Sequence, residues 1–432
     1  MFIALLSLIA VLSCNQTENN ESLLNSTEIS DSCRSHPQNS YEVYIPKRAP
    51  EAKLPLLIIL DPHGKGCFAL QKFRYAANTY PSILVASNYI KNGSQDYVKA
   101  LQELINDVSE KYPVSNSVFV SGFSGGARMA LAFAQNKHIN GLLLCGALAN
   151  ADVINTLKTS VYSISGTDDF NFVETAQFLF NEQSIPSNLR IELTRQSHSW
   201  PDSLLLAEAY GFIYLSDRDA PAPSGSSVKA FIARQNKKID SLESQKAILE
   251  ATMLARNLTL TKPFSDEKSV SATYQKLNNS EAFNKQLSQL KSTLEFETKA
   301  RDQYIRAFST KDSLWWKNEI STLEQKLKNE SDPFKSDMYQ RIKSFWGIAC
   351  YSLGKQAIQN RDIKLMRNII PVYRMLEPDN AYVYYYAAFP AFWSGNDTVA
   401  INLLNKALTA GFEDMDLINQ NFPSSVSSQI KH

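Results

Sequence analysis

Short apolar runs alternate with amphipathic stretches through residues 41–222. The runs that read as β-strands are YEVYIP, LPLLIILD, SILVAS, SVFVSG, GLLLCGAL, VYSIS and LRIELTR. Between them, segments such as 97–111, 126–135 and 172–181 carry apolar residues at spacings of three and four, which is typical of amphipathic helices. Runs that are apolar throughout, such as Leu56–Leu60, predict strands buried on both faces. We therefore expect one α/β domain over 41–222, with a mostly parallel sheet covered by helices.

The composition changes at residues 219–227, DAPAPSGSS, a Pro-, Ala- and Ser-rich stretch typical of a linker. Residues 223–345 are rich in Lys, Glu, Gln, Leu and Ala and have few β-branched runs. This composition predicts a second domain of long amphipathic helices that pack on each other.

Residues 346–432 carry a weak internal repeat. A shift of 34 residues, the length of a tetratricopeptide repeat, brings Gly354 onto Ala388. The segment TVAINLLNKAL then places small and large packing residues as the helix-turn-helix of that repeat does. The region resembles a pair of tetratricopeptide repeats, which implies an all-α fold and a peptide or protein partner.

The N-terminal segment 1–14, MFIALLSLIAVLSC, is apolar but too short to span a bilayer as a mature helix. It reads as an export signal, and Val11–Cys14 resembles the bacterial lipobox. That resemblance implies lipidation of Cys14, a membrane anchor, and a location in the bacterial cell envelope, periplasmic or at the cell surface. Residues 15–40 would then form a polar tether. The alternative is a buried N-terminal strand or helix.

Charge and cysteine content argue against some classes of function and of site. The net charge is +1, from 44 basic and 43 acidic residues, which argues against nucleic-acid binding. In an exported protein Cys33 and Cys67 could pair, whereas Cys145 lies in an apolar strand pattern and is expected to be buried. Because there is no CxxC or His-rich spacing, we expect no metal site and no cofactor.

The segment Gly122-Phe123-Ser124-Gly125-Gly126 fits the G-x-S-x-G motif, with a strand pattern before it and a helix pattern after it. Such a turn presents the serine at the end of the strand. The N-terminus of the following helix favours negative charge that develops at the serine. Ser124 is therefore the candidate nucleophile, and it requires a base to remove its proton.

The candidate base is His198, which follows the last predicted strand in TRQSHSWPD, where α/β-hydrolases place their histidine. Asp169, in GTDDF after the preceding strand, is the candidate acid, with Asp168 as the substitute if the turn is offset. The alternatives are that the aspartates only cap a helix and that His198 is a solvated loop residue. The order Ser, Asp, His at successive strand ends favours a triad.

The oxyanion of the reaction needs two N–H donors. The backbone N–H of Gly125 is one candidate, and the other is the N–H of Gly64 or Lys65 in the loop after LPLLIILD. His63, in the same loop, is expected to orient that loop through a side-chain hydrogen bond rather than to transfer protons.

The motifs DPHGKG, SNYIKNG, GFSGGARMA, GTDDFNF and SHSWP together resemble the small lidless α/β-hydrolases of the dienelactone hydrolase, feruloyl esterase and polyhydroxybutyrate depolymerase group. The resemblance implies a serine esterase. Little sequence separates the strand near Leu148 from the one at Val161, so the site is expected to be open, which suits a small-molecule, glycan or polymer ester. Trp200 and Phe170 either line this site or belong to the core.

Three functions fit these observations. The first is a serine hydrolase that cleaves carboxylic esters through an acyl-enzyme intermediate. The second is a peptidase of the prolyl oligopeptidase type, which uses the same residue types in the same order. The third is a surface interaction protein whose hydrolase half is vestigial. The presence of the serine and the histidine favours an enzyme.

Overall fold

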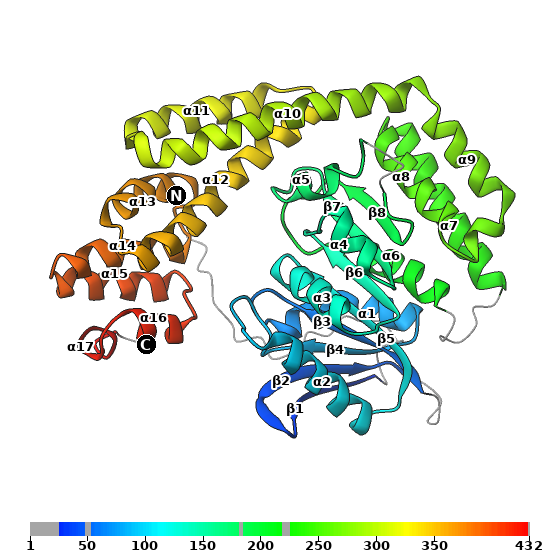
Figure 1. Ribbon diagram of the computed structural model, residues 1–432, viewed down its shortest axis with the longest axis horizontal. Coiled ribbons are helices and arrows are strands. Elements are labelled where there is room, and N and C mark those ends of the chain that lie inside the picture. Colours follow the sequence, from blue (N-terminus) through cyan, green and yellow to red (C-terminus); the bar gives the residue numbers. More distant parts are fainter. Residues whose placement is uncertain (1–25, 48–52, 181–184, 218–224, 431–432) are drawn as a thin grey trace, which may run out of the picture. The chain divides into compact units, whose positions relative to one another are not determined.

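The computed structural model describes residues 26–47, 53–180, 185–217 and 225–430. The predicted signal segment with Cys14, and most of the proline-rich linker, lie outside these residues. The chain forms two compact units (Figure 1). The first comprises Met1–Thr167 and Asn171–Asn284, and the second comprises Asp168–Phe170 and Lys285–His432. The predicted domain limit at 222 thus separates strand-containing from helical sequence, while the first compact unit continues to Asn284.

The described part of the first unit contains one eight-stranded sheet with the order β1-β2-β4-β3-β5-β6-β7-β8. Strand β2 pairs antiparallel with β1 and β4, and the pairs from β4 through β3 to β8 are parallel. The sheet is mostly parallel, as the sequence predicted. The strands are β1 (Thr27–Cys33), β2 (His36–Ile45), β3 (Leu54–Leu60), β4 (Ile83–Ser87), β5 (Val114–Phe123), β6 (Gly141–Cys145), β7 (Ser160–Gly166) and β8 (Leu189–Thr194).

Helices cover both faces of this sheet because its central strands are apolar on both faces (Figure 1). Leu57 and Ile59 of β3 share a core with α1 (Gly66–Thr79) and α6 (Ser203–Ser216), which pack side by side. The alternate residues of β3 point to the opposite face. On that face α2 (Tyr97–Lys111) packs beside α3 (Gly125–Asn136). Two short helices, α4 (Ala151–Thr156) and α5 (Phe172–Ala176), follow β6 and β7.

The first unit also includes helices from the sequence that follows the linker. These are α7 (Gly225–Ser244), α8 (Ile248–Thr259), the 3₁₀ turn η3 (Phe264–Asp266) and α9 (Lys268–Asn278). Phe231 of α7 and Phe264 stack on each other with ring centroids 4.8 Å apart, and each meets Phe212 of α6 edge to face. These helices therefore share the core of the sheet.

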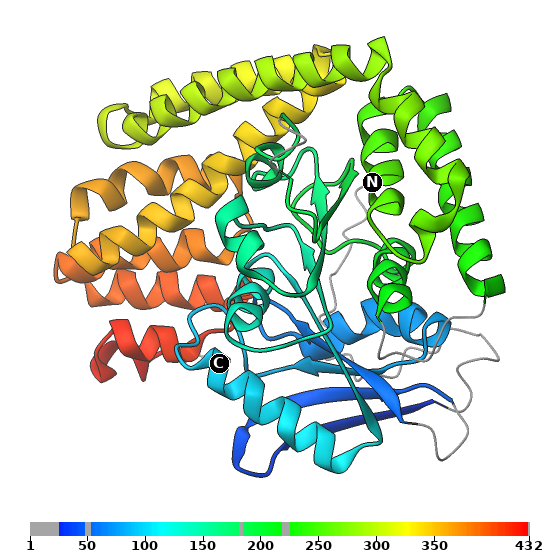
Figure 2. The same ribbon diagram turned by 45° about the vertical axis from the view of Figure 1, so that its right-hand side comes forward.

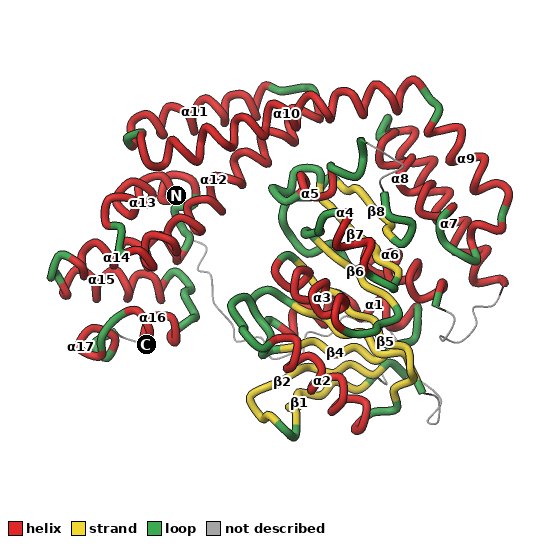
Figure 3. Tube along the Cα trace, in the orientation of Figure 1, coloured by secondary structure: helices red, strands yellow, loops and turns green. Residues whose placement is uncertain are grey.

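The second unit is all helical in its described residues beyond 285, as the tube in Figure 3 shows. Figure 2 shows the later helices following one another as a stack. Gly354 of α12 lies so close to Tyr386 of α14 that an added Cβ would be 2.2 Å from a ring carbon. The tetratricopeptide assignment for this region stays a prediction. The helices are α10 (Glu281–Thr310), α11 (Ser313–Asn329), α12 (Pro333–Asn360), α13 (Ile363–Leu376), α14 (Ala381–Trp393), α15 (Asp397–Thr409), α16 (Met415–Asn421) and α17 (Ser424–Ser427).

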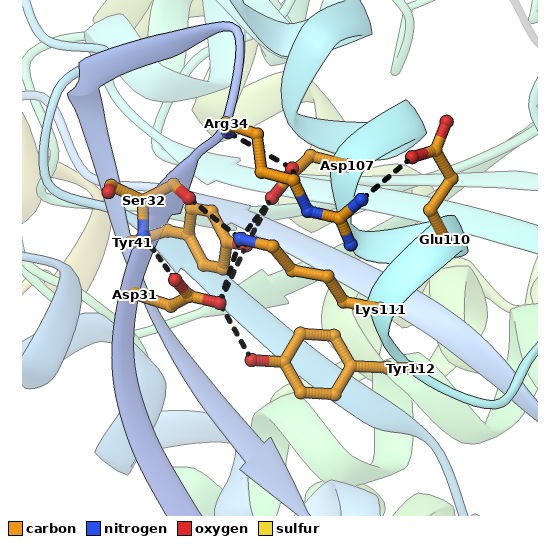
Figure 4. A network of polar contacts seen from close by, with 8 residues as sticks. All are labelled: Asp31, Ser32, Arg34, Tyr41, Asp107, Glu110, Lys111 and Tyr112. Atoms are coloured by element: carbon orange, nitrogen blue, oxygen red, sulfur yellow. Dashed lines mark hydrogen bonds and ion pairs between the residues drawn. The ribbon is translucent and has the colours of Figure 1, made fainter.

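A polar network holds the outer strand β1 against α2 (Figure 4). Lys111 donates to Asp31 at 3.0 Å and forms an ion pair with Asp107 at 2.7 Å. Tyr41 donates to Asp107 at 2.6 Å, and Tyr112 donates to Asp31 at 3.0 Å. The polar tether expected over 15–40 is thus replaced, from Thr27 onward, by β1 and the start of β2. A charged outer strand is one way in which proteins protect a sheet edge from further pairing.

Cys33, at the end of β1, is a buried and free thiol. The possible pairing of Cys33 with Cys67 is therefore not formed in this structure. Burial raises the pKa of the Cys33 thiol to about 11, and the nearby Asp107 acts in the same direction. Among the described residues, none of the helices combines the length and the apolar character that crossing a bilayer requires.

Replacing Lys111 by Met is expected to destabilise the first unit in a pH-dependent way. Burial raises the pKa of Asp107, but hydrogen bonds from Lys111 and Tyr41 outweigh it, so the pKa lies below its usual 3.8. This stabilisation is present above the unfolded-state pKa and is lost as the pH falls through the folded-state pKa. We expect Lys111→Met to lower the free energy of unfolding by about 3 kcal/mol at pH 7. Urea unfolding should show a much smaller loss near pH 2. An equal loss at both pH values would contradict this explanation.

Candidate active site

Ser124 lies at a sharp turn between β5 and α3. Its backbone has φ 52° and ψ −115°, in the left-handed half of dihedral space that a residue with a Cβ rarely adopts. Such a conformation costs on the order of 1–3 kcal/mol and persists only where the surroundings enforce it. Here the Ser124 N–H donates to the carbonyl of Cys145 at the end of β6, at 2.8 Å. The strained turn that the G-x-S-x-G motif predicts is therefore present.

The glycines of the motif are required by close backbone contacts. A Cβ on Gly122 would lie 2.4 Å from the backbone of Gly126. A Cβ on Gly126 would lie 2.0 Å from the carbonyl oxygen of Leu60, the last residue of β3. These distances are far below contact distance, and the atoms met are backbone atoms that cannot move aside independently. The turn therefore fits against β3 only without side chains at these positions.

His198 faces Ser124. Its Nε2 lies 2.9 Å from the Ser124 Oγ, within hydrogen-bonding distance. His198 is half-buried, in the loop that follows β8, and its ring centroid is 4.7 Å from that of Phe123. Of the residues predicted for the site, Ser124 and His198 are thus brought together by the structure. A hydroxyl in this position can lose its proton to the imidazole as it attacks a substrate.

Gly64 and Lys65, the other predicted oxyanion donors, lie in the loop after β3. The Gly64 N–H donates to the Asp61 carbonyl at 3.1 Å, and the Lys65 N–H contacts Asp61 Oδ1 at 3.3 Å. The second distance is beyond the usual N–H···O range of about 2.7–3.2 Å, so this bond is weak. Which of the two N–H groups, that of Gly64 or that of Lys65, serves the oxyanion stays a prediction.

Asp61 orients this loop, and the sequence reading missed it. Asp61 accepts hydrogen bonds from the His63 N–H at 2.8 Å and from the Trp200 indole N–H at 2.9 Å. The imidazole of His63 is exposed and makes no hydrogen bond with any described residue, so the expected role of His63 was wrong. The signal that could have found Asp61 is a carboxylate directly after an all-apolar strand, where a buried charge requires donors. Trp200 is buried and packs on Phe123, which makes it part of the core.

Asp168 and Asp169 follow β7, at the same edge of the sheet as the strand ends before Ser124 and His198. Both belong to the second compact unit, where Arg301 donates to the carbonyl of Phe170 at 2.9 Å. Burial and the nearby Asp337 raise the pKa of Asp168 above its usual value. A raised pKa does not suit a carboxylate that must stay ionised beside a histidine, which favours Asp169. The pairing of Asp169 with His198 stays a prediction.

The described residues contain no group of three or more His, Cys, Asp or Glu side chains arranged to hold a metal ion. The groups at the candidate site are a side-chain hydroxyl, a side-chain imidazole and backbone N–H groups. Together these can perform nucleophilic and acid–base chemistry.

No family model matches the chain. No curated protein matches it either. Among solved structures, it is similar to the fluorophosphonate-binding serine hydrolase F of Staphylococcus aureus, with 11% identity over 44% of this chain and 97% of that one and a TM-score of 0.36. It is similar to Est1E of Butyrivibrio proteoclasticus, with 12% identity over 42% of this chain and 95% of that one and a TM-score of 0.34. It is also similar to an acylaminoacyl peptidase of Pyrococcus horikoshii, with 9% identity over 50% of this chain and 46% of that one and a TM-score of 0.35.

Substituting Gly126 by Ala is expected to prevent correct formation of the turn, because the new Cβ would overlap the Leu60 carbonyl. We expect little soluble protein, or a loss of more than about 3 kcal/mol in the free energy of unfolding. Gly93→Ala is the matched control, because an added Cβ meets nothing within 4 Å there and only its φ of 91° is unfavourable. That change should cost about 1–2 kcal/mol. Equal stability of the two variants in thermal unfolding would show that the contact with β3 is not limiting.

Proposed function

We propose that the protein is a serine hydrolase that cleaves carboxylic esters through an acyl-enzyme intermediate. The observation that carries the proposal is the 2.9 Å contact between Ser124 Oγ and His198 Nε2 at a strained turn that opens α3. This pair supplies a nucleophile and a base within bonding distance, and the N-terminus of a helix favours negative charge that develops beside it.

In the proposed reaction, Ser124 Oγ attacks the ester carbonyl carbon while His198 Nε2 takes the hydroxyl proton. The Gly125 N–H and the Lys65 or Gly64 N–H would stabilise the resulting oxyanion. Collapse of this intermediate breaks the bond to the alcohol, which leaves with the proton held by His198. Water, deprotonated by His198, then attacks the acyl-enzyme and releases the carboxylic acid and Ser124. Asp169 is proposed to hold the imidazole in the required tautomer.

The type of ester is proposed from access to the site. Between β6 and β7 the chain is short, and α4, Ala151–Thr156, is the helix formed there. This favours a site open to a small-molecule, glycan or polymer ester. A prolyl oligopeptidase-type peptidase remains the alternative enzyme, and a binding module with a vestigial site is the alternative from another class.

Ser124→Ala is expected to abolish covalent labelling by a fluorophosphonate probe and to lower kcat by at least about a thousandfold, because the nucleophile is removed. Labelling is read by in-gel fluorescence, and turnover with a panel of p-nitrophenyl esters and prolyl amides. Circular dichroism of the variant checks that it folds. Turnover of the esters alone supports the proposal, and turnover of the amides favours the peptidase. If the probe does not label the folded wild-type protein, the result contradicts the proposal and favours the binding module with a vestigial site.

Two neighbouring substitutions separate the candidate acids. Asp169→Asn is expected to lower kcat by roughly 10³- to 10⁴-fold, because an amide holds His198 in the wrong tautomer. Asp168→Asn is expected to keep kcat and to raise the free energy of unfolding at pH 7. The sign follows from the raised pKa of Asp168, since a neutral side chain avoids the cost of ionising a buried carboxyl. This gain should vanish below the usual carboxyl pKa. The reverse pattern in kcat would identify Asp168 as the acid.

A further inference from the structure

A buried carboxylate lies at the end of β3 with hydrogen bonds on both of its oxygens. Asp61 is 3% exposed. Its Oδ1 accepts from the backbone N–H groups of His63 and Lys65, at 2.8 and 3.3 Å, and its Oδ2 accepts from the Trp200 indole N–H at 2.9 Å. The first two donors belong to the predicted oxyanion loop, and the third belongs to the loop that carries His198. One side chain therefore connects the two loops.

The two oxygens of the Asp61 side chain suit this position. No lysine or arginine of the described residues forms an ion pair with it, so N–H groups supply the compensation that a buried carboxylate requires. A carboxylate can accept on both oxygens at once. An asparagine has a single acceptor oxygen, and its NH₂ group would face an N–H donor on one side. The amide of an asparagine at position 61 therefore cannot accept hydrogen bonds from both the loop after β3 and the loop that carries His198.

Trp200 connects Asp61 to the loop that carries His198, the proposed base. Trp200 lies two residues after His198, and its ring packs on Phe123 with centroids 5.4 Å apart and on Phe73 at 5.9 Å. Phe123 in turn lies 4.7 Å from the His198 ring and directly precedes Ser124. The indole is thus fixed on one side by aromatic packing and at its N–H by Asp61.

We propose that Asp61 is a positioning residue that sets the geometry of the oxyanion loop and of His198 relative to Ser124. This inference rests on the proposed serine hydrolase function. Its effect is expected in the chemical step rather than in substrate binding, because it places the donors and the base that act in the transition state.

The test compares Asp61→Asn with wild type in ester turnover and in the rate of fluorophosphonate labelling. We expect kcat and the labelling rate to fall by roughly 10- to 100-fold, with KM changed by less than about threefold. Trp200→Phe keeps the aromatic packing and removes the N–H, and it should lower kcat by roughly three- to tenfold. Because both changes break the same hydrogen bond, the double variant should lose less than the product of the two single losses.

The matched control is Asp107→Asn. Asp107 is also a buried carboxylate with three donors, from Tyr41, Lys111 and the Arg34 N–H. It lies near the end of α2, which leads into the start of β5, at the opposite end of that strand from Ser124. This variant should lower the urea midpoint and leave kcat at the wild-type value. A similar fall of kcat in Asp107→Asn would show that general destabilisation, not positioning, explains Asp61.

Wild-type kcat and labelling in folded Asp61→Asn would overturn the inference while leaving the hydrolase proposal intact. If Asp61→Asn does not fold, Trp200→Phe decides, and a wild-type kcat there would overturn the inference equally. Absence of Ser124-dependent labelling in the wild-type protein would overturn the hydrolase proposal itself, and the positioning role with it.

Discussion

The fit of the Ser124 turn between three strands is the constraint on which the proposed chemistry depends. Ser124 has a left-handed backbone that a serine does not adopt without enforcement. The enforcement comes from β6, whose Cys145 carbonyl accepts the Ser124 N–H, and from β3, whose last residue leaves room only for a glycine at 126. Because β5 pairs with both of these strands, the central sheet itself holds the turn. A rigid turn of this kind presents the hydroxyl without further reorganisation.

The parallel strands bring the remaining groups to the same edge of the sheet. The ends of β3 and β8 lead into the loops with Lys65 and His198, and these loops touch through Asp61 and Trp200. A loop ordinarily has more freedom than a strand end. Here a buried carboxylate removes part of that freedom in both loops together, since leaving any of its donors unpaired in a buried site carries a penalty. In the proposed site, hydrogen bonds among residues outside the reacting set would therefore supply part of the precision that the chemistry requires.

The sequence predicted the strands with apolar runs and the serine turn, because these features depend on local pattern. Strand β1 was missed because Thr27–Cys33 is mostly polar, and its place is set by partners distant in the chain such as Lys111 and Tyr112. For a similar reason, the sequence interpretation assigned the orienting of the loop after β3 to His63 rather than to Asp61. A loop sequence shows which side chains are polar, but the acceptor that the N–H groups of the loop meet depends on how the backbone turns. Such contacts become visible only in three dimensions.

Helix α8 shows that the helices beyond the linker also form hydrogen bonds with the sheet. Strand β8 is an edge strand, and an edge leaves backbone groups unpaired. Asn257 of α8 is fully buried, accepts the Ile191 N–H at 3.0 Å and donates to the Ile191 carbonyl at 2.9 Å. Its amide thus takes the place of a neighbouring strand at this residue. Arg190 adds hydrogen bonds to the Leu260 carbonyl and the Thr261 hydroxyl. Since the loop with His198 starts where β8 ends, the position of the proposed base depends on this helix as well as on the strands.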